Sequence, residues 1–152
     1  MDIVLVEPQI PQNTGSIART CAATDTPLHL VGPIGFDLSE KAVRRAGLDY
    51  WPYVKLSRHG TWENYVEAQN PRKVWLFSKF GERLYTTADF DMNDALVFGS
   101  ETKGLGAEFL SRFDPQQILK IPIVTEYVRS LNLSNAVSIA LYEARRQLAL
   151  DT

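Results

Sequence analysis

Residues 96–106 read LVFGSETKGLG, in which an apolar run ends in a polar loop that carries three glycines. Gly99 and Gly104 have the glycine spacing of the phosphate-binding loop of nucleotide triphosphatases. The match ends there, because Leu105 stands where that loop carries a lysine and Glu101 adds a negative charge. The loop therefore argues against a nucleotide triphosphatase. It predicts a ligand that uses backbone contacts and needs no anion clamp.

A second candidate for chemistry is residues 11–21, PQNTGSIARTC. In the simplest interpretation Asn13 or Thr14 caps a helix with Gly15 in its first turn, and Arg19 is a solvated charge. In the functional interpretation Arg19 lies one turn inside the helix and points over the end of the sheet. There it would act as a fixed cation or as a fork of hydrogen-bond donors. The residues alone leave both interpretations open.

Residues 130–135, SLNLSN, place four small polar side chains directly before an apolar helical pattern. Ser134 could cap that helix alone. Ser130 and Asn132 would then be free to donate and accept hydrogen bonds toward a ligand. Capping and ligand binding are both open for this pair.

Residues 41–53, KAVRRAGLDYWPY, combine basic and aromatic side chains. The basic members are Lys41, Arg44 and Arg45, and the aromatic members are Tyr50, Trp51 and Tyr53. Such groups could contact phosphates and stack on unpaired bases. Alternatively a helix ends at Gly47 and the aromatic rings fold onto the core, which is the interpretation we favour for Trp51.

The elements that must position these groups alternate along the chain between strands and helices. Short runs rich in Val, Ile, Leu and aromatics predict buried strands, and the segments between them have helical character. The predicted strands are residues 3–6, 28–31, 74–77, 95–98 and 118–121, and the predicted helices are 15–23, 40–46, 62–69, 107–113 and a C-terminal helix within 132–150. This pattern predicts an α/β fold with a mostly parallel sheet flanked by helices.

The unusual polar segments all follow predicted strands. They are residues 8–15, 78–81, 99–106 and 122–132. In a parallel sheet all of them emerge at the carboxyl edge, where open α/β sheets bind ligands. We therefore expect one site assembled from several loops.

Length and composition restrict the function further. A chain of 152 residues fits a single domain, residues 1–152, and its apolar runs are too short to cross a membrane. With one cysteine, Cys21, and two histidines we expect no internal disulfide and no metal site. The net charge of −2 argues against a wholly basic surface for nucleic acid and leaves local patches possible. The cytoplasm is the expected location.

The C-terminal helical pattern has apolar residues on more than one flank. Val137, Ala140, Leu141, Ala144 and Leu148 form one stripe, while Ile139 and Tyr142 add apolar surface outside it. Such a helix needs two partners. One would be its own sheet, and the second could be another subunit.

Taken together, these segments resemble the three motifs of the SPOUT superfamily of RNA methyltransferases. The matching stretches are residues 13–15 with 18–19, residues 98–105, and residues 121–122 with 129–137. Residues 44–50, RRAGLDY, are similar to the minimal subfamily that methylates the wobble ribose of tRNA, the tRNA (cytidine/uridine-34 2′-O)-methyltransferases. The resemblance covers nearly the whole chain.

The resemblance implies a fold, a cofactor and site residues. The fold would carry a deep trefoil knot at its C-terminal end, a feature that general topology rules treat as exceptional. The protein would be a homodimer that binds S-adenosylmethionine and the tRNA anticodon loop. The implied catalytic or substrate-positioning residues are Asn13, Arg19, Glu101, Ser130 and Asn132. The implied cofactor-binding residues are Phe77, Gly99, Gly104, Ile121, Ser130 and Leu131, and the implied RNA-binding residues are Lys41, Arg44, Arg45 and Arg129.

The implied reaction transfers a methyl group from S-adenosylmethionine to a ribose 2′-hydroxyl. Arg19 serves better as a clamp on phosphate or on the developing alkoxide than as a general base, because a guanidinium does not readily lose its proton in proteins. Two alternatives stay open: methylation of another tRNA position or of rRNA, and a non-catalytic knotted dimer that binds S-adenosylmethionine or RNA.

Overall fold

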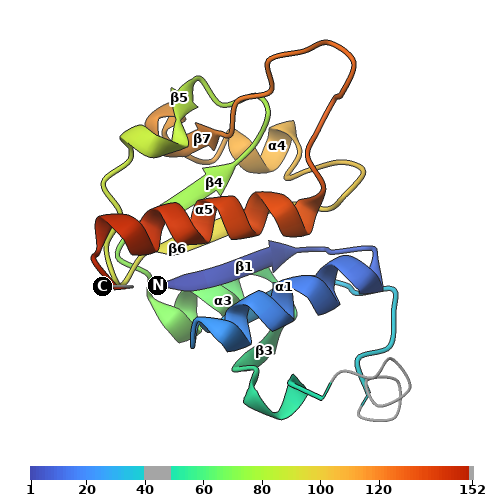
Figure 1. Ribbon diagram of the computed structural model, residues 1–152. Coiled ribbons are helices and arrows are strands. Elements are labelled where there is room, and N and C mark those ends of the chain that lie inside the picture. The colour runs from blue at the N-terminus through green and yellow to red at the C-terminus, as the bar shows by residue number, and fades with distance from the viewer. Residues whose placement is uncertain (40–48, 151–152) are drawn as a thin grey trace.

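The computed structural model describes residues 1–39 and 49–150. Seven strands form one sheet in the order β3-β2-β1-β6-β4-β7-β5, and every neighbouring pair is parallel (Figure 1). The strands are β1 (Asp2–Val6), β2 (Leu28–Val31), β3 (Leu56–His59), β4 (Val74–Phe77), β5 (Arg83–Leu84), β6 (Ala95–Phe98) and β7 (Ile118–Lys120). The predicted α/β class with a parallel sheet is confirmed.

Helices cover both faces of the sheet (Figure 1). They are α1 (Pro11–Ala23), α3 (Trp62–Gln69), α4 (Ala107–Leu110) and α5 (Leu133–Gln147), with 3-10 turns η1 (Trp51–Tyr53), η2 (Tyr85–Thr87) and η3 (Pro115–Gln117). Buried residues of α1 and α5 join one hydrophobic cluster, and those of α3 join a second cluster that α4 also contacts. The predicted helix at 40–46 lies outside the described residues.

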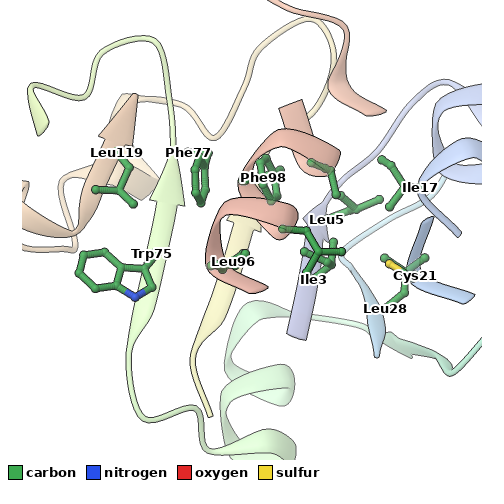
Figure 2. Packing of buried hydrophobic residues seen from close by; sticks show 14 of the residues in the cluster. Ile3, Leu5, Ile17, Cys21, Leu28, Trp75, Phe77, Leu96, Phe98 and Leu119 are labelled. Carbon is green, nitrogen blue, oxygen red and sulfur yellow. The ribbon is translucent and has the colours of Figure 1, made fainter. Parts of the chain in front are cut away.

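Alternation along the strands explains the two clusters. In β1, Ile3 and Leu5 belong to the cluster under α1 and α5, whereas Val4 belongs to the cluster under α3. Successive strand residues point to opposite faces, so a strand buried on both faces is apolar throughout. Near the carboxyl edge Phe77 and Phe98 stack with their ring centroids 4.6 Å apart (Figure 2).

Two strands have no counterpart in the sequence prediction. Strand β3 reads LSRH and is mostly half-buried, and β5 has two residues that are half-buried and exposed. Both lie at the edges of the sheet. An edge strand buries less side-chain surface, so the continuous apolar run that marks the inner strands is missing from its sequence.

The strand order brings distant segments together. Strand β6 lies between β1 and β4, so the loops that follow β1 and β6 are neighbours. Helix α5 returns from β7 and packs beside α1, where the hydroxyls of Thr20 and Ser138 lie 3.3 Å apart. The carboxyl edge therefore collects the segments after β1, β6 and β7 (Figure 1). Across residues 1–39 and 49–150, no helix is both long enough and apolar enough to span a membrane.

Candidate active site

Helix α1, which includes residues 11–21, begins earlier in the sequence than expected. Helix α1 begins at Pro11, and neither Asn13 nor Thr14 caps it; both side chains are buried inside its first turns. The expected start at Gly15 is therefore wrong. Proline is favoured at the first helical position, because its fixed φ suits the helix and its missing N–H would have no partner there. Arg19 consequently lies in the second half of α1 and not one turn from its start.

Glu101, from the loop after β6, supports the entry to α1. Its Oε2 accepts a hydrogen bond from the backbone N–H of Gln9 at 2.8 Å, and its Oε1 accepts from the N–H of Ile10 at 3.0 Å. The Thr102 hydroxyl also donates to the side-chain oxygen of Gln9 at 2.7 Å. A carboxylate at a helix N-terminus is favoured by the helix dipole. The loop after β6 and the start of α1 are thus one hydrogen-bonded unit.

Asn13 connects this unit to the third polar segment. Its Nδ2 donates to Glu101 Oε1 at 3.4 Å, and its Oδ1 accepts from Asn132 Nδ2 at 3.0 Å. Asn132 in turn accepts at Oδ1 from the backbone N–H groups of Ser134 and Asn135, at 2.9 and 3.3 Å. The three segments that the sequence singles out therefore meet in one chain of hydrogen bonds, which we call the amide relay: Glu101, Asn13 and Asn132.

The groups at the two ends of the amide relay determine which way its side-chain amides are oriented. A carboxylate only accepts hydrogen bonds, so Asn13 must turn its NH2 group toward Glu101. Its oxygen is then left to accept from Asn132, and the oxygen of Asn132 is left for the N–H donors at the start of α5. Every amide orientation follows from the acceptor at one end and the donors at the other.

Asn132, and not Ser134, is the N-cap of α5. The expectation that Ser134 caps the helix and leaves Asn132 free is wrong, because the Ser134 hydroxyl itself donates to Asn132 Oδ1 at 2.6 Å. Capping uses only the oxygen of Asn132. An amide NH2 carries two donors, and the relay uses one of them. Asn132 is exposed, so its second N–H is available to a ligand.

The loop after β6 closes on itself. The backbone N–H of Gly104 donates to the carbonyl of Ser100 at 2.9 Å, the N–H of Ser100 donates back at 3.2 Å, and the N–H of Lys103 donates to the Ser100 hydroxyl. A phosphate-binding loop would direct such amides at its ligand. Here the loop uses them internally, which agrees with the mismatch to the phosphate-binding motif.

Glycine is required at two positions of this loop. A Cβ on Gly99 would lie 2.0 Å from the carbonyl carbon of Gly104 and 2.2 Å from the amide nitrogen of Leu105, closer than any real contact. Gly104 has φ of +61°, in the left-handed region that other residues rarely adopt. The spacing that resembles a phosphate loop is therefore the spacing of a tight turn.

Arg19 is not part of the amide relay. Its guanidinium lies over the ring of Tyr50, with Cζ 5.8 Å from the ring centroid. Within residues 1–39 and 49–150, no carboxylate lies within ion-pairing distance of Arg19, and no hydrogen bond joins its side chain to Asn13, Glu101 or Asn132. From its sequence, Tyr50 is expected only as a base-stacking or core residue. Its contact with Arg19 comes from a segment distant in sequence and leaves no local signal.

The expected cofactor-binding residues lie on the segments of the carboxyl edge. Phe77 ends β4 and is buried, and Ile121 follows β7 and packs at the border of the core. Ser130 is exposed and Leu131 is 37% exposed, directly before the Asn132 cap. The group thus offers apolar side chains, a hydroxyl and main-chain atoms along one edge.

Of the expected RNA-binding residues, three lie outside the described ones: Lys41, Arg44 and Arg45. Arg129 is exposed, and among the residues that the structure describes no carboxylate pairs with it. Trp51 is half-buried and packs against the core, as favoured from the sequence. In residues 1–39 and 49–150, no three His, Cys, Asp or Glu side chains gather so that they could hold a metal ion.

Known proteins resemble this chain in sequence over nearly its whole length. The sequence matches the model of the SpoU rRNA Methylase family over residues 1–142. It is 43% identical over 148 residues to the tRNA (cytidine(34)-2'-O)-methyltransferase of Escherichia coli (strain K12), which covers 97% of this chain and 94% of that relative. The corresponding enzyme of Saccharophagus degradans is 44% identical over 147 residues, which covers 97% of this chain and 95% of that relative.

Solved structures share the fold. One, described as "Structural insights into the 2-OH methylation of C/U34 on tRNA", superposes with a TM-score of 0.88 at 48% identity and covers 97% of this chain and 95% of that one. The SpoU methyltransferase AviRb from Streptomyces viridochromogenes, in complex with the cofactor AdoMet, has a TM-score of 0.82 at 25% identity, over 98% of this chain and 58% of that one. With the family pattern matched over nearly its whole length and its motif residues joined at one edge of the sheet, the chain belongs to the SpoU rRNA methylase family of RNA methyltransferases.

Proposed function

We propose that the protein transfers a methyl group from S-adenosylmethionine to the ribose 2′-hydroxyl of nucleotide 34, the wobble position of tRNA. The observation that carries the proposal is the amide relay, since Glu101, Asn13 and Asn132 come from the three segments that resemble the methyltransferase motifs and are joined by hydrogen bonds. The named relatives, which match nearly end to end, support the wobble nucleotide as the target.

The residues at the carboxyl edge fit S-adenosylmethionine. Its adenosine needs apolar contact and main-chain partners, which Ile121, Leu131 and the backbone around Phe77 and Gly99 would offer. The Ser130 hydroxyl is exposed and would serve a polar group of the cofactor. Leu105, and not a lysine, follows Gly104, as suits a ligand that carries a sulfonium and no phosphate. When bound, the cofactor supplies a methyl group on a positively charged sulfur.

The protein's contribution to catalysis is chiefly to position the ribose. Holding two reactants in attack geometry supplies about 7 to 11 kcal/mol, whereas a general base contributes about 10²- to 10⁴-fold in rate. The amide relay is suited to this task, because both of its amides are held at both ends and cannot rotate freely. The exposed N–H of Asn132 would hold the ribose or its neighbouring phosphate.

The 2′-oxygen gains negative charge as its proton departs. Arg19 would stabilise that charge or clamp the adjacent phosphate, and the proton would leave to phosphate or water. The guanidinium suits the role, since no carboxylate among the described residues neutralises it. Arg129 would contact the RNA backbone, together with Lys41, Arg44 and Arg45.

We further propose that residues 1–152 form a single knotted domain, that two copies form a homodimer, and that the protein works in the cytoplasm, where its tRNA substrate is found. The return of α5 from β7 to the side of α1 is compatible with a trefoil knot. On α5, Ile139 and Tyr142 are 37% and 50% exposed although apolar, which supports a second subunit on this flank. With so little basic surface on one chain, the tRNA would contact both subunits.

An rRNA substrate is the second candidate, because the family model that matches is that of rRNA methylases. A methyl-labelling assay with each RNA in turn distinguishes a tRNA substrate from an rRNA substrate. The protein is incubated with methyl-labelled S-adenosylmethionine and either bulk tRNA or rRNA, each from cells that lack this protein. We expect label in tRNA and background in rRNA. Label in rRNA alone would transfer the proposal to that substrate, and no label in either RNA, despite measurable cofactor binding, would favour a non-catalytic dimer.

A further inference from the structure

Tyr50 contacts helix α1 through its hydroxyl and its ring. Its hydroxyl donates to the backbone carbonyl of Gly15 at 2.9 Å, and its ring is half-buried against the core cluster. The next residues form the turn η1, whose Trp51 also packs on the core. Tyr50 is therefore held at its backbone, along its ring and at its hydroxyl.

The same ring carries the guanidinium of Arg19. The Cζ atom lies 5.8 Å from the ring centroid, within the range of about 6 Å for cation–π attraction. Gly15 and Arg19 are four residues apart in α1, so they are neighbours on one side of the helix. One tyrosine thus holds the backbone of one turn and the side chain of the next.

This contact holds Arg19 without using its donors. A cation–π contact places the guanidinium over the face of the aromatic ring, whereas an ion pair engages the N–H groups of the guanidinium with a carboxylate. Two other arginines illustrate the difference, since Arg146 donates to Glu143 at 2.8 Å and Arg112 donates to Glu63 at 2.6 Å. Arg19 keeps its charge and its fork of donors for a ligand.

The hydroxyl of Tyr50 stays protonated at physiological pH. Burial raises the pKa of this tyrosine above its usual value, and the effects of Arg19, which lowers it, and of Asp49, which raises it, are smaller. A phenolate could not donate to the Gly15 carbonyl. The bond that anchors the ring is therefore present under working conditions.

We infer that Tyr50 is a positioning residue for the methyl transfer: it holds the guanidinium of Arg19 over its ring in a fixed place, with the donors left for the RNA. The inference rests on the role proposed for Arg19. Fixing a long side chain in advance removes part of the entropy cost of binding.

Two variants of Tyr50 distinguish the contribution of its ring from that of its hydroxyl. Tyr50→Leu removes ring and hydroxyl, and we expect the rate of methyl transfer at saturating substrate to fall 10- to 100-fold, about the effect of misplacing a reacting group. Tyr50→Phe keeps the ring, and we expect a loss of about fivefold, equivalent to one hydrogen bond. Tyr85→Leu is the matched control, since Tyr85 is also half-buried against the core cluster and lies in η2, outside the segments of the site. It should leave the rate unchanged.

The decisive comparison repeats Tyr50→Leu in an Arg19→Ala background. If Tyr50 acts through Arg19, the second change alters the residual rate by less than about twofold. A loss as large as in the wild-type background would overturn the inference, as would a folded Tyr50→Leu protein with the wild-type rate.

A readout that needs no activity is the Nε–H resonance of Arg19 in nitrogen-15 NMR spectra. We expect it to be shifted by the Tyr50 ring in the wild type and in Tyr50→Phe, and to move to the position of a free arginine in Tyr50→Leu. An unchanged resonance would overturn the inference. If the resonance moves but the wild type transfers no methyl group, the proposed function fails and the placement of Arg19 by Tyr50 stands.

Discussion

Asn132 donates a hydrogen bond from its side-chain amide to the side-chain oxygen of Asn13, 3.0 Å away and 119 positions earlier in the chain. The same Asn132 caps α5, and the same Asn13 donates to Glu101. One pair of amides therefore couples the start of the last helix to the loop after β6. Each relay residue has both a structural and a proposed chemical duty, and substitutions can separate the two.

Asn132→Asp should separate capping from the relay. Aspartate caps a helix as well as asparagine does, so the free energy of unfolding should change by less than about 1 kcal/mol. The new carboxylate cannot donate to Asn13, so we expect the rate of methyl transfer to fall at least tenfold. Asn132→Ala, which loses both duties, should lower the free energy of unfolding by about 1 to 2 kcal/mol as well. Denaturant unfolding and single-turnover rates test both variants. Equal activity of Asn132→Asp and the wild type would show that the donor of Asn132 is not needed.

Asn13→Asp should be strongly destabilising. Asn13 is buried and faces the carboxylate of Glu101, so the substitution sets two acceptors of like charge against each other. We expect the free energy of unfolding to fall by about 2 to 4 kcal/mol. Gln12→Glu makes the same change of amide to acid at the preceding, exposed residue and should cost less than about 0.5 kcal/mol. Similar urea midpoints for the two variants would contradict the relay as drawn.

Gly99→Ala should disrupt the loop after β6. The new methyl group would fall 2.0 Å from the carbonyl carbon of Gly104, so the turn must open. We expect destabilisation of about 2 to 4 kcal/mol and loss of S-adenosylmethionine binding by calorimetry. Gly35→Ala is the control, because nothing lies within 4 Å of a Cβ there. If Gly99→Ala binds the cofactor as Gly35→Ala does, the loop is not part of the cofactor site.

Stability should decrease between pH 7.5 and 5.5 because of His59. Burial and the neighbouring His29, whose Nδ1 lies 3.0 Å from His59 Nε2, lower the pKa of His59 in the folded protein. Tyr65 contacts both rings, and Asp2 lies 3.4 Å from the far nitrogen of His29. As the pH falls, His59 takes up a proton near pH 6.5 in the unfolded chain and only at a lower pH in the folded protein. The contribution of His59 to the free energy of unfolding is therefore fully present above that pH and is lost as the pH falls through the folded pKa.

His59→Gln should flatten that dependence. The variant has no imidazole at position 59, so its urea midpoint should change less from pH 7.5 to 5.5 than that of the wild type. Parallel curves for the two proteins would assign the pH dependence to other groups.

Arg19→Ala should separate catalysis from cofactor binding. The guanidinium contacts Tyr50 and belongs to no hydrogen bond of the amide relay, so its loss should leave the affinity for S-adenosylmethionine within about twofold. The transfer rate should fall by about 10²- to 10³-fold, as when one donor to a developing oxyanion is removed. Calorimetry and single-turnover transfer measure the two quantities. Equal loss of both would contradict this division of duties.

Three inner strands could be predicted to the residue, and β1 and β7 to within one residue, because burial on both faces leaves a continuous apolar run in the sequence. Leu28–Val31, Val74–Phe77 and Ala95–Phe98 begin and end where the apolar runs do. The edge strand Leu56–His59 could not, because its half-buried residues carry no such run. Local sequence signals report burial, and an edge strand has little of it.

That the loops meet at one edge of the sheet could also be predicted from the sequence. The hydrogen-bond partners of the individual loop residues could not. Which polar residue caps α5 depends on the backbone at Asn132 and on Asn13, which is distant in the sequence. The early start of α1 depends on Glu101, which accepts from the N–H groups just before Pro11. Tertiary contacts determine which residue caps a helix and where the helix begins. A local run of small polar residues contains several that could equally well serve as the cap.

Locating the transferred methyl group on the RNA tests the proposed function. Bulk tRNA from cells that lack this protein is incubated with the protein and methyl-labelled S-adenosylmethionine, then digested and analysed by mass spectrometry. We predict one labelled nucleotide, the wobble nucleotide 34, with the label on its ribose 2′-oxygen, and labelling that is about 10²- to 10³-fold slower with Arg19→Ala. Label on a base or on the ribose of another nucleotide would contradict the account.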